Sequence, residues 1–240
     1  MNADLSFDPS IPLIDADSET DDLIYRISHD LRASVRALQE LPGWIGEDLD
    51  QAAIRLPPPT ERHLDLIAAH ACRLDLMLTG LLEYSRIGRL QPITAVKPVD
   101  VLDEVIDDLC LPDDVNITIG LDRGRVQMGM ADLQRIFSAL LLNAVRFHPD
   151  HAPAIHISGG PIDGRTWRID VSDNGSGIPE DKREFVLRPM TKLVSRDVDP
   201  GAGMGLAILR KITWTYGGSI EVLAPKSGIG TLVRVTLAVN

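Results

Sequence analysis

One histidine beside a carboxylate is the first pair in this sequence whose side chains could form and break covalent bonds. His29 and Asp30 lie in residues 25–36, which read YRISHDLRASVR. A neutral imidazole is a nucleophile when a neighbouring carboxylate orients the proton on one ring nitrogen, because the other nitrogen can then attack an electrophile. The pair also fits an ordinary surface histidine on a helix, so its interpretation depends on the rest of the chain.

A glycine-rich segment after a predicted strand suggests a site for a base. Asp173, Gly175 and Gly177 stand in residues 173–179, which read DNGSGIP. A carboxylate at a strand end can accept a hydrogen bond from an exocyclic amine and so select adenine, while glycines let the backbone approach a flat base without Cβ clashes. An ordinary Asn-Gly turn is the alternative interpretation.

A second set of glycines precedes a helix predicted over residues 206–216. Gly201, Gly203 and Gly205 stand in the segment GAGMG. Alternating glycines before a helix leave backbone N–H groups directed at an anion, and the positive end of the helix adds a favourable field. The pattern is weak when alone, and no strand–turn–helix unit with an acidic partner downstream makes it a Rossmann site.

A helix predicted over residues 132–147, with Asp132 as its cap, supplies a third polar group. Ala139, Asn143 and Arg146 share one face of this helix. A mid-helix asparagine is mildly unfavourable unless its amide has a task, such as holding a hydrated magnesium ion. Arg146 could neutralise phosphate charge. A hydrogen-bonded amide in the core is the alternative interpretation of Asn143.

Two long helices must position His29. Apolar or small residues step by three and four along residues 24–45 and again along residues 64–85, which is the seam of helices packed in a bundle. His29 lies off this seam and should face water. We expect a kink at Pro42 and a stop at Pro57–Pro59. Because two helices cannot bury both seams alone, the pattern predicts that two hairpins pair into a four-helix bundle, that is, a homodimer.

Composition limits the class of protein. The 240 residues are 44% hydrophobic and 25% charged, with a net charge of −11 and no basic stripe, which argues against nucleic acid as a partner. Cys72 and Cys110 form neither a disulfide framework nor a metal spacing, and no apolar run reaches membrane-spanning length. We therefore expect a cytoplasmic protein without membrane insertion.

The pattern changes from heptads to mixed strands and helices along the chain. Strands alternating with helices in the C-terminal part predict an α+β fold, with helices covering one face of a mixed sheet. The predicted parts are an acidic N-terminal arm (1–19), a helical hairpin (20–88), a linker (89–98) and an α/β sandwich domain (99–240).

Together these motifs resemble the transmitter region of the two-component sensor histidine kinases. That family joins a dimerisation and phosphotransfer hairpin to a Bergerat-type ATP-binding domain, and the resemblance covers residues 20–240. The matching segments are residues 28–32 (H box), 140–147 (N box), 173–177 (G1 box), 201–206 (G2 box), and Phe185 with the segment to Lys192 (F box and ATP lid). Residues 83–89, EYSRIGR, are similar to the phytochrome-type branch.

The resemblance implies roles for individual residues. His29 would be the phosphoacceptor and Asp30 its general base. Asn143 would bind Mg²⁺, and Lys192 or Arg196 would reach the γ-phosphate of ATP. The implied nucleotide-binding residues are Asn143, Arg146, Phe147, Asp173, Gly175, Gly177, Lys192, Gly201, Gly203, Gly205, Leu206 and Thr231.

The implied activity is that of an ATP-dependent protein histidine kinase. The chain would act as a homodimer, phosphorylate His29 from Mg-ATP and pass the phosphoryl group to an aspartate of a response regulator receiver domain. Its signal would come either from a separate sensor protein or from a further part of a longer protein. One alternative is a dimeric phosphotransfer protein whose ATP-like domain is degenerate. A serine kinase or anti-sigma factor with the same ATP fold would leave the heptad hairpin unexplained.

Three positions depart from the family pattern. Ala139 replaces the first asparagine of the N box, which removes a polar partner near the metal and phosphates. Ser34 replaces the proline that commonly bends the first helix after the histidine. Ala33 replaces the Thr or Asn that positions water for dephosphorylation in many relatives, so we expect little intrinsic phosphatase activity.

Overall fold

The computed structural model describes residues 15–88, 91–148, 152–194 and 201–238. The chain divides into two compact units, Met1–Arg86 and Ile87–Asn240, and each is treated by itself below. Most of the predicted acidic arm, part of the predicted linker, and Arg196 lie outside the described residues. Within the described ranges, no helix has an apolar stretch long enough to cross a bilayer.

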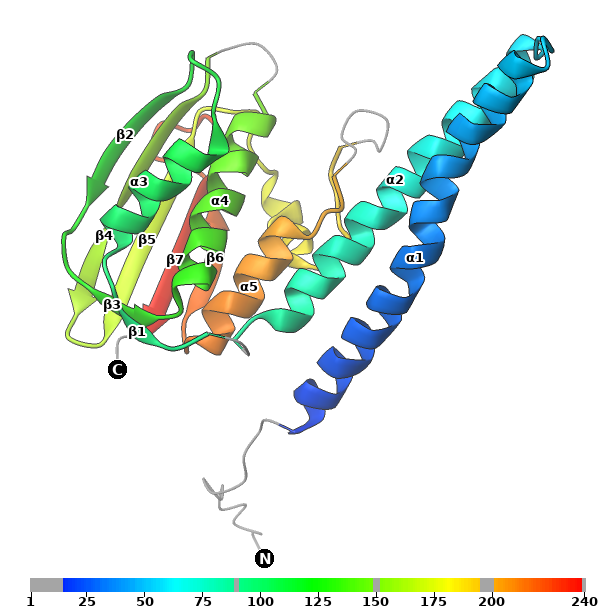
Figure 1. The fold of residues 1–240 in the computed structure, drawn as a ribbon. Coiled ribbons are helices and arrows are strands. Elements are labelled where there is room, and N and C mark those ends of the chain that lie inside the picture. The colour runs from blue at the N-terminus through cyan, green and yellow to red at the C-terminus, as the bar shows by residue number, and fades with distance from the viewer. Residues whose placement is uncertain (1–14, 89–90, 149–151, 195–200, 239–240) are drawn as a thin grey trace, which may run out of the picture. The chain divides into compact units, whose positions relative to one another are not determined.

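The first unit is a hairpin of two long helices, α1 (Asp15–Gln51) and α2 (Pro58–Arg86) (Figure 1). Helix α1 continues through Pro42, and the helices are tied by Arg32, whose Nη2 donates to Thr79 Oγ1 at 3.2 Å. Small or polar side chains such as Ser28, 1% exposed, occupy the buried positions of α1. The predicted apolar seam remains accessible in the single chain at Ile27, Leu31, Leu38, Leu41 and Ile45, each more than 40% exposed.

In its described residues, the second unit contains two sheets and three α-helices (Figure 1). The helices are α3 (Pro98–Leu109), α4 (Met130–Arg146) and α5 (Gly205–Thr215). The main sheet has the order β2-β4-β5-β7-β6, formed by β2 (Asn116–Leu121), β4 (Ala154–Asp163), β5 (Thr166–Asp173), β7 (Leu232–Ala238) and β6 (Ser219–Leu223). Strands β2 and β4 are parallel, and the other neighbours are antiparallel.

A short second sheet pairs β1 (Thr94–Val96) with β3 (Val126–Met128). Strand β1 falls inside the segment predicted as a linker, so part of that segment is integrated into the second unit. Two turns of 3₁₀ helix, η1 (Glu180–Lys182) and η2 (Phe185–Leu187), follow β5 along the chain.

One face of the main sheet forms the core of the second unit. Side chains alternate along β5 and β7, so that Trp167, Ile169 and Val235 are at most 2% exposed. The three helices cover this face (Figure 1), and α4 contributes the fully buried Phe137. The predicted α+β fold is confirmed, whereas the four-helix bundle stays a prediction.

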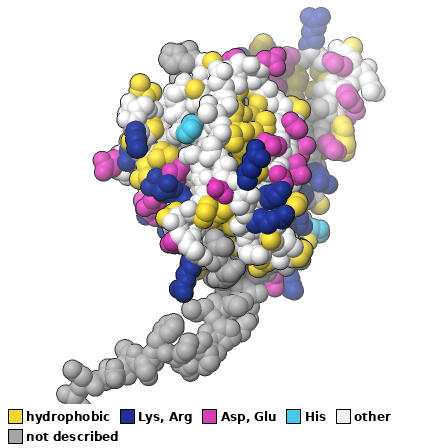
Figure 2. Space-filling model, turned by 90° about the vertical axis from the view of Figure 1, so that its left-hand side faces the viewer, with side chains coloured by type: hydrophobic (Ala, Val, Ile, Leu, Met, Phe, Trp, Pro, Cys, Tyr) yellow, Lys and Arg dark blue, Asp and Glu magenta, His cyan; other side chains and the backbone are white. Residues whose placement is uncertain are grey.

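The surface view in Figure 2 shows basic and acidic side chains interspersed on one face of the molecule. Lys and Arg side chains lie among Asp and Glu side chains on this face, and the full sequence has a net charge of −11.

Candidate functional site

Asp173 ends strand β5 and is joined to a segment distant in the sequence. Its Oδ1 accepts hydrogen bonds from the backbone N–H groups of Gly175 at 2.8 Å and Thr231 at 3.1 Å, and its own N–H donates to Thr231 O at 2.9 Å. Thr231 is 58 residues away, so the segment is more than a local Asn-Gly turn. The second carboxylate oxygen, Oδ2, accepts no bond in the described part of the chain.

The electrostatic environment of Asp173 suits an acceptor for an amine. Burial raises the pKa of Asp173, and the hydrogen bonds from Gly175 and Thr231 and the charge of His148 counteract part of that rise. The open Oδ2 is a partly desolvated acceptor, and a donor that reaches it gains a charge-assisted hydrogen bond.

Backbone segments approach Asp173 so closely that only glycine fits. Gly230 has φ +91°, and a Cβ placed on it would lie 1.9 Å from Asp173 O. A Cβ on Gly177 would lie 3.0 Å from Gly230 O, and one on Gly175 would lie 2.7 Å from Phe147 O. The end of α4, the 173–177 segment and the loop before β7 therefore meet at one place.

The polar face of α4 lies against the second glycine segment. A Cβ placed on Gly205 would be 3.8 Å from Asn143 Nδ2 and 3.9 Å from its Oδ1, and one on Gly201 would be 2.5 Å from Arg146 Nη1. Asn143 is half-buried, and its side-chain amide makes no hydrogen bond to the residues described. Its amide oxygen is therefore available to a metal ion, which fits the predicted Mg²⁺ ligand.

Helix α5 begins at Gly205 with Leu206 in its first turn, and the preceding Gly203 contacts the predicted lid segment. Gly203 has φ +69°, and a Cβ on it would lie 2.5 Å from Thr191 O. Thr191 Oγ1 in turn donates to the carbonyls of Phe185 and Arg188 at 3.0 and 2.6 Å. Lys192, which follows Thr191 and is half-buried, is thus placed next to the glycine segment.

His148 makes a contact that the sequence pattern did not predict. Its Nε2 donates to Asn174 Oδ1 at 2.5 Å, and Asn174 Oδ1 also accepts from Ala154 N at 2.7 Å. Phe147, the residue that follows α4, accepts from Ser176 N at 3.2 Å through its carbonyl. Both contacts attach the end of α4 to the segment that carries Asp173.

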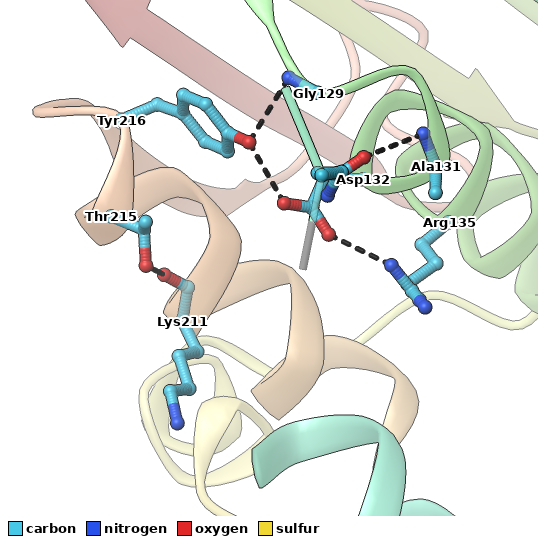
Figure 3. Close-up of polar contacts among 8 residues, drawn as sticks. Gly129, Ala131, Asp132, Arg135, Lys211, Thr215 and Tyr216 are labelled. Atoms are coloured by element: carbon cyan, nitrogen blue, oxygen red, sulfur yellow. Dashed lines mark hydrogen bonds and ion pairs between the residues drawn. The ribbon is translucent and has the colours of Figure 1, made fainter. Parts of the chain in front are cut away.

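A buried polar cluster holds the other end of α4 (Figure 3). Asp132 is 0% exposed, and it accepts from Tyr216 Oη at 2.8 Å and from Arg135 Nη1 at 2.9 Å, while Gly129 N donates to Tyr216 Oη at 3.1 Å. Burial, together with Asp132, raises the pKa of Tyr216 to about 12. The prediction that Asp132 caps the helix is wrong: Gly129 is the N-cap, because the Asp132 carboxylate is engaged by Tyr216 and Arg135.

The phosphoacceptor candidate lies in the first unit on α1. The His29 side chain is 69% exposed, and its Nδ1 lies 3.3 Å from Asp30 Oδ1. The imidazole faces water, as its position off the seam indicated, and Nε2 has no partner within the described ranges. Asp30 can therefore orient the Nδ1 proton while Nε2 is presented to an electrophile.

Comparison with known proteins supports the resemblance found in the motifs. Residues 130–240 match the family described as histidine kinase-, DNA gyrase B-, and HSP90-like ATPase. The chain is 34% identical over 233 residues to the sensor protein KdpD of Rathayibacter rathayi, covering 95% of this chain and 26% of the relative. It is 28% identical over 231 residues to the methanogenesis regulatory histidine kinase FilI of Methanothrix harundinacea, covering 92% and 25%. The chain thus spans about a quarter of the length of these relatives.

Solved structures agree on the fold. Full-length ShkA in complex with AMPPNP superposes over 91% of this chain and 46% of its own, with a TM-score of 0.64 at 19% identity. The mycobacterial sensor histidine kinase MprB superposes over 62% of this chain and 98% of its own, with a TM-score of 0.55 at 22% identity. The predicted relationship to sensor histidine kinases is confirmed.

Proposed function

This chain carries a domain of the histidine kinase-, DNA gyrase B- and HSP90-like ATPases and is homologous to sensor histidine kinases, and from that premise we propose that it phosphorylates His29 from Mg-ATP. The observation that carries the proposal is the convergence of Asp173, Asn143 and the glycines around Gly205 in one neighbourhood of the second unit. Each would recognise a different part of the nucleotide.

The base is read by Asp173. Its open Oδ2 accepts a hydrogen bond from the exocyclic amine of adenine, while Oδ1 stays bound to Gly175 and Thr231. Guanine presents a carbonyl oxygen at the corresponding position, which an ionised carboxylate repels. The residues that surround the base in this proposal are Phe147, Asp173, Gly175, Gly177 and Thr231.

The phosphates lie between α4 and the start of α5. Backbone N–H groups at the N-terminus of α5 attract an anion, and Arg146 adds positive charge beside Gly201. When Mg²⁺ is bound, Asn143 holds it and the ion neutralises phosphate charge. The residues assigned to this part are Asn143, Arg146, Lys192, Gly201, Gly203, Gly205 and Leu206.

The chemical step is an attack by the imidazole. The lone pair of His29 Nε2 forms the N–P bond with the γ-phosphorus, and the bond from that phosphorus to the bridging oxygen breaks, so that ADP leaves with the electron pair. The Nδ1 proton passes to Asp30, which lies 3.3 Å away. Positioning and charge neutralisation supply most of the rate in transfers of this kind.

Two partners follow from the same proposal. The phosphoryl group passes from His29 to an aspartate of a response regulator receiver domain. A second copy of the chain covers the exposed seam of α1, where Ile27 is 50% and Leu31 is 49% exposed. Burial of such a seam is the main contribution to helix-bundle assembly.

Transfer of label from γ-labelled ATP tests the proposal. With Mg²⁺, the wild type and a His70→Gln control, which alters an exposed histidine on α2, should take up acid-labile, base-stable label, and His29→Gln should take up none. Equal labelling of His29→Gln would contradict the proposal. No label on any folded variant would favour the alternative, a phosphotransfer protein with a degenerate ATP-like domain.

A further inference from the structure

Three side chains from both helices of the hairpin form a stack that ends at the phosphoacceptor. The rings of Tyr25 and His29 have centroids 6.2 Å apart and planes inclined by 25°. The guanidinium carbon of Arg86 lies 5.3 Å from the centroid of the Tyr25 ring. We propose that Tyr25 is a positioning residue for the His29 imidazole and that Arg86 holds Tyr25 in place, an inference that rests on the proposed phosphorylation of His29.

The first contact limits the orientation of the nucleophile. Tyr25 and His29 are four residues apart on α1 and so lie one above the other on the same helix face. Centroid separations of about 4.5–7 Å are those of interacting aromatic pairs. An imidazole that is 69% exposed would otherwise rotate freely about its side-chain torsions. The Tyr25 ring covers one side of it and thereby restricts that rotation.

The contact with Asp30 determines which nitrogen of the His29 ring is available for attack. Asp30 Oδ1 lies 3.3 Å from Nδ1 of His29, which favours the tautomer protonated at Nδ1. The Tyr25 ring restricts the orientation of the imidazole plane, and the Asp30 carboxylate determines which ring nitrogen faces Asp30. Nε2 is then presented in one direction, so that fewer orientations must be lost before transfer.

Arg86 connects this arrangement to the other helix. It is the last residue of α2, and a guanidinium within about 6 Å of a tyrosine ring centroid makes a favourable cation–π contact. Arg32, about two turns beyond Tyr25 along α1, ties the same two helices through Thr79 at 3.2 Å and Asp75 at 3.9 Å. The orientation of Tyr25 is therefore set by contacts with α2 as well as by α1 itself.

A purely structural role for Tyr25 would be seen in a different quantity, the unfolding temperature, when Tyr25 is replaced. The ring is 38% exposed, and an exposed pair on one helix contributes little to stability. Loss of the stack should therefore lower the rate of phosphoryl transfer without changing nucleotide binding or thermal unfolding. A structural role would change the unfolding temperature first.

Autophosphorylation of the whole chain, followed as the rate of label uptake against ATP concentration, separates these cases. Here kcat is the maximal rate constant of the single transfer to His29, and KM is the ATP concentration at half that rate. We expect Tyr25→Leu to lower kcat about tenfold with KM for ATP unchanged, and Tyr25→Phe, which keeps the ring, to stay within about twofold of the wild type. Arg86→Gln should lower kcat and Arg86→Lys, which keeps a cation, should restore most of it. Trp44→Leu, which removes an exposed aromatic residue elsewhere on α1, is the matched control and should be unchanged.

The imidazole proton resonances of His29, assigned by their loss in His29→Gln, report the stack directly. They should carry a ring-current shift in the wild type and in Tyr25→Phe that disappears in Tyr25→Leu. If Tyr25→Leu kept the kcat of the wild type, the inference about Tyr25 would be overturned. The same holds if its activity fell only in proportion to a lower unfolding temperature. In both cases the proposed function would stand. A wild type that takes up no label from ATP would refute the proposed function, and the inference would fail with it.

Discussion

Replacing Asp173 by asparagine should weaken nucleotide binding while leaving the local backbone intact. Asparagine keeps an oxygen at the position of Oδ1, which accepts from Gly175 N at 2.8 Å and Thr231 N at 3.1 Å. Its amide nitrogen must then occupy the place of Oδ2, where the proposal puts the amine of adenine. The substitution therefore exchanges an acceptor for a donor at one atom.

The magnitude follows from that exchange. A hydrogen bond to a charged acceptor contributes about 1.5–3 kcal/mol, and two donors facing each other leave both unsatisfied at a further cost, so we expect a loss of about 2–4 kcal/mol. At about 1.4 kcal/mol per factor of ten, Kd for an ATP analogue should rise roughly 30- to 1,000-fold. Calorimetric or fluorescence titration with Mg²⁺ present measures this directly.

A control variant and a series of pH values test the assignment of Asp173 further. Asp170→Asn changes the same residue type on the same strand, but Asp170 is paired with Arg234 at 2.9 Å and should not affect nucleotide affinity. Because burial raises the pKa of Asp173, wild-type affinity should fall as pH drops through that raised value, starting above the usual range of an aspartate. The asparagine variant should lack this dependence. Binding by Asp173→Asn within threefold of the wild type would refute the assignment of Asp173 as the adenine acceptor.

Three further changes have expected outcomes. Asn143→Ala should abolish the magnesium dependence of ATP-analogue affinity, and affinity that still rises with Mg²⁺ would exclude Asn143 as the metal ligand. Tyr216→Phe removes the donor to the buried Asp132 and should lower the free energy of unfolding by about 1–3 kcal/mol in denaturant titrations. Because the folded pKa of Tyr216 is raised from 10.0 to about 12, the stability that its neutral form contributes is present below pH 10 and should be lost as the pH rises from 10 to 12, a loss absent from Tyr216→Phe. Gly203→Ala would place a Cβ 2.5 Å from Thr191 O at φ +69°, so nucleotide affinity should fall at least tenfold, together with a loss of stability of about 1–3 kcal/mol, and an unchanged Kd would show that this segment does not border the phosphates.

Local patterns predicted the elements of this fold because their periodicity is set by burial. The steps of three and four gave both helices of the hairpin, and alternation gave strands such as β5 and β7. Motif residues that are distant in the sequence are neighbours in the structure, since Asn143 lies beside Gly205 and Asp173 beside Thr231.

Contacts between distant residues could not be read from the same patterns. The Asp132–Tyr216 hydrogen bond joins residues 84 apart, and a local interpretation assigned Asp132 to a helix cap instead. The bond between His148 and Asn174 spans 26 residues and has no sequence signature. In each case the partner is chosen by tertiary packing, which a helical or strand period does not encode.

The spacing of apolar residues on α1 predicted a packing face but did not show which helix packs against it. The heptads predicted an apolar packing face, but the face that α1 buries in the single chain includes Ser28 and Val35 instead. The apolar residues point elsewhere and stay exposed, which is the arrangement that a second hairpin would complete.

The most direct test of the central claim is tandem mass spectrometry of the intact chain after incubation with Mg-ATP at neutral pH. We predict one added phosphoryl group, which fragmentation places on His29 and which is absent from His29→Gln. A phosphoryl group on Ser28 or Ser34, or its persistence in His29→Gln, would contradict the assignment of His29 as the phosphoacceptor.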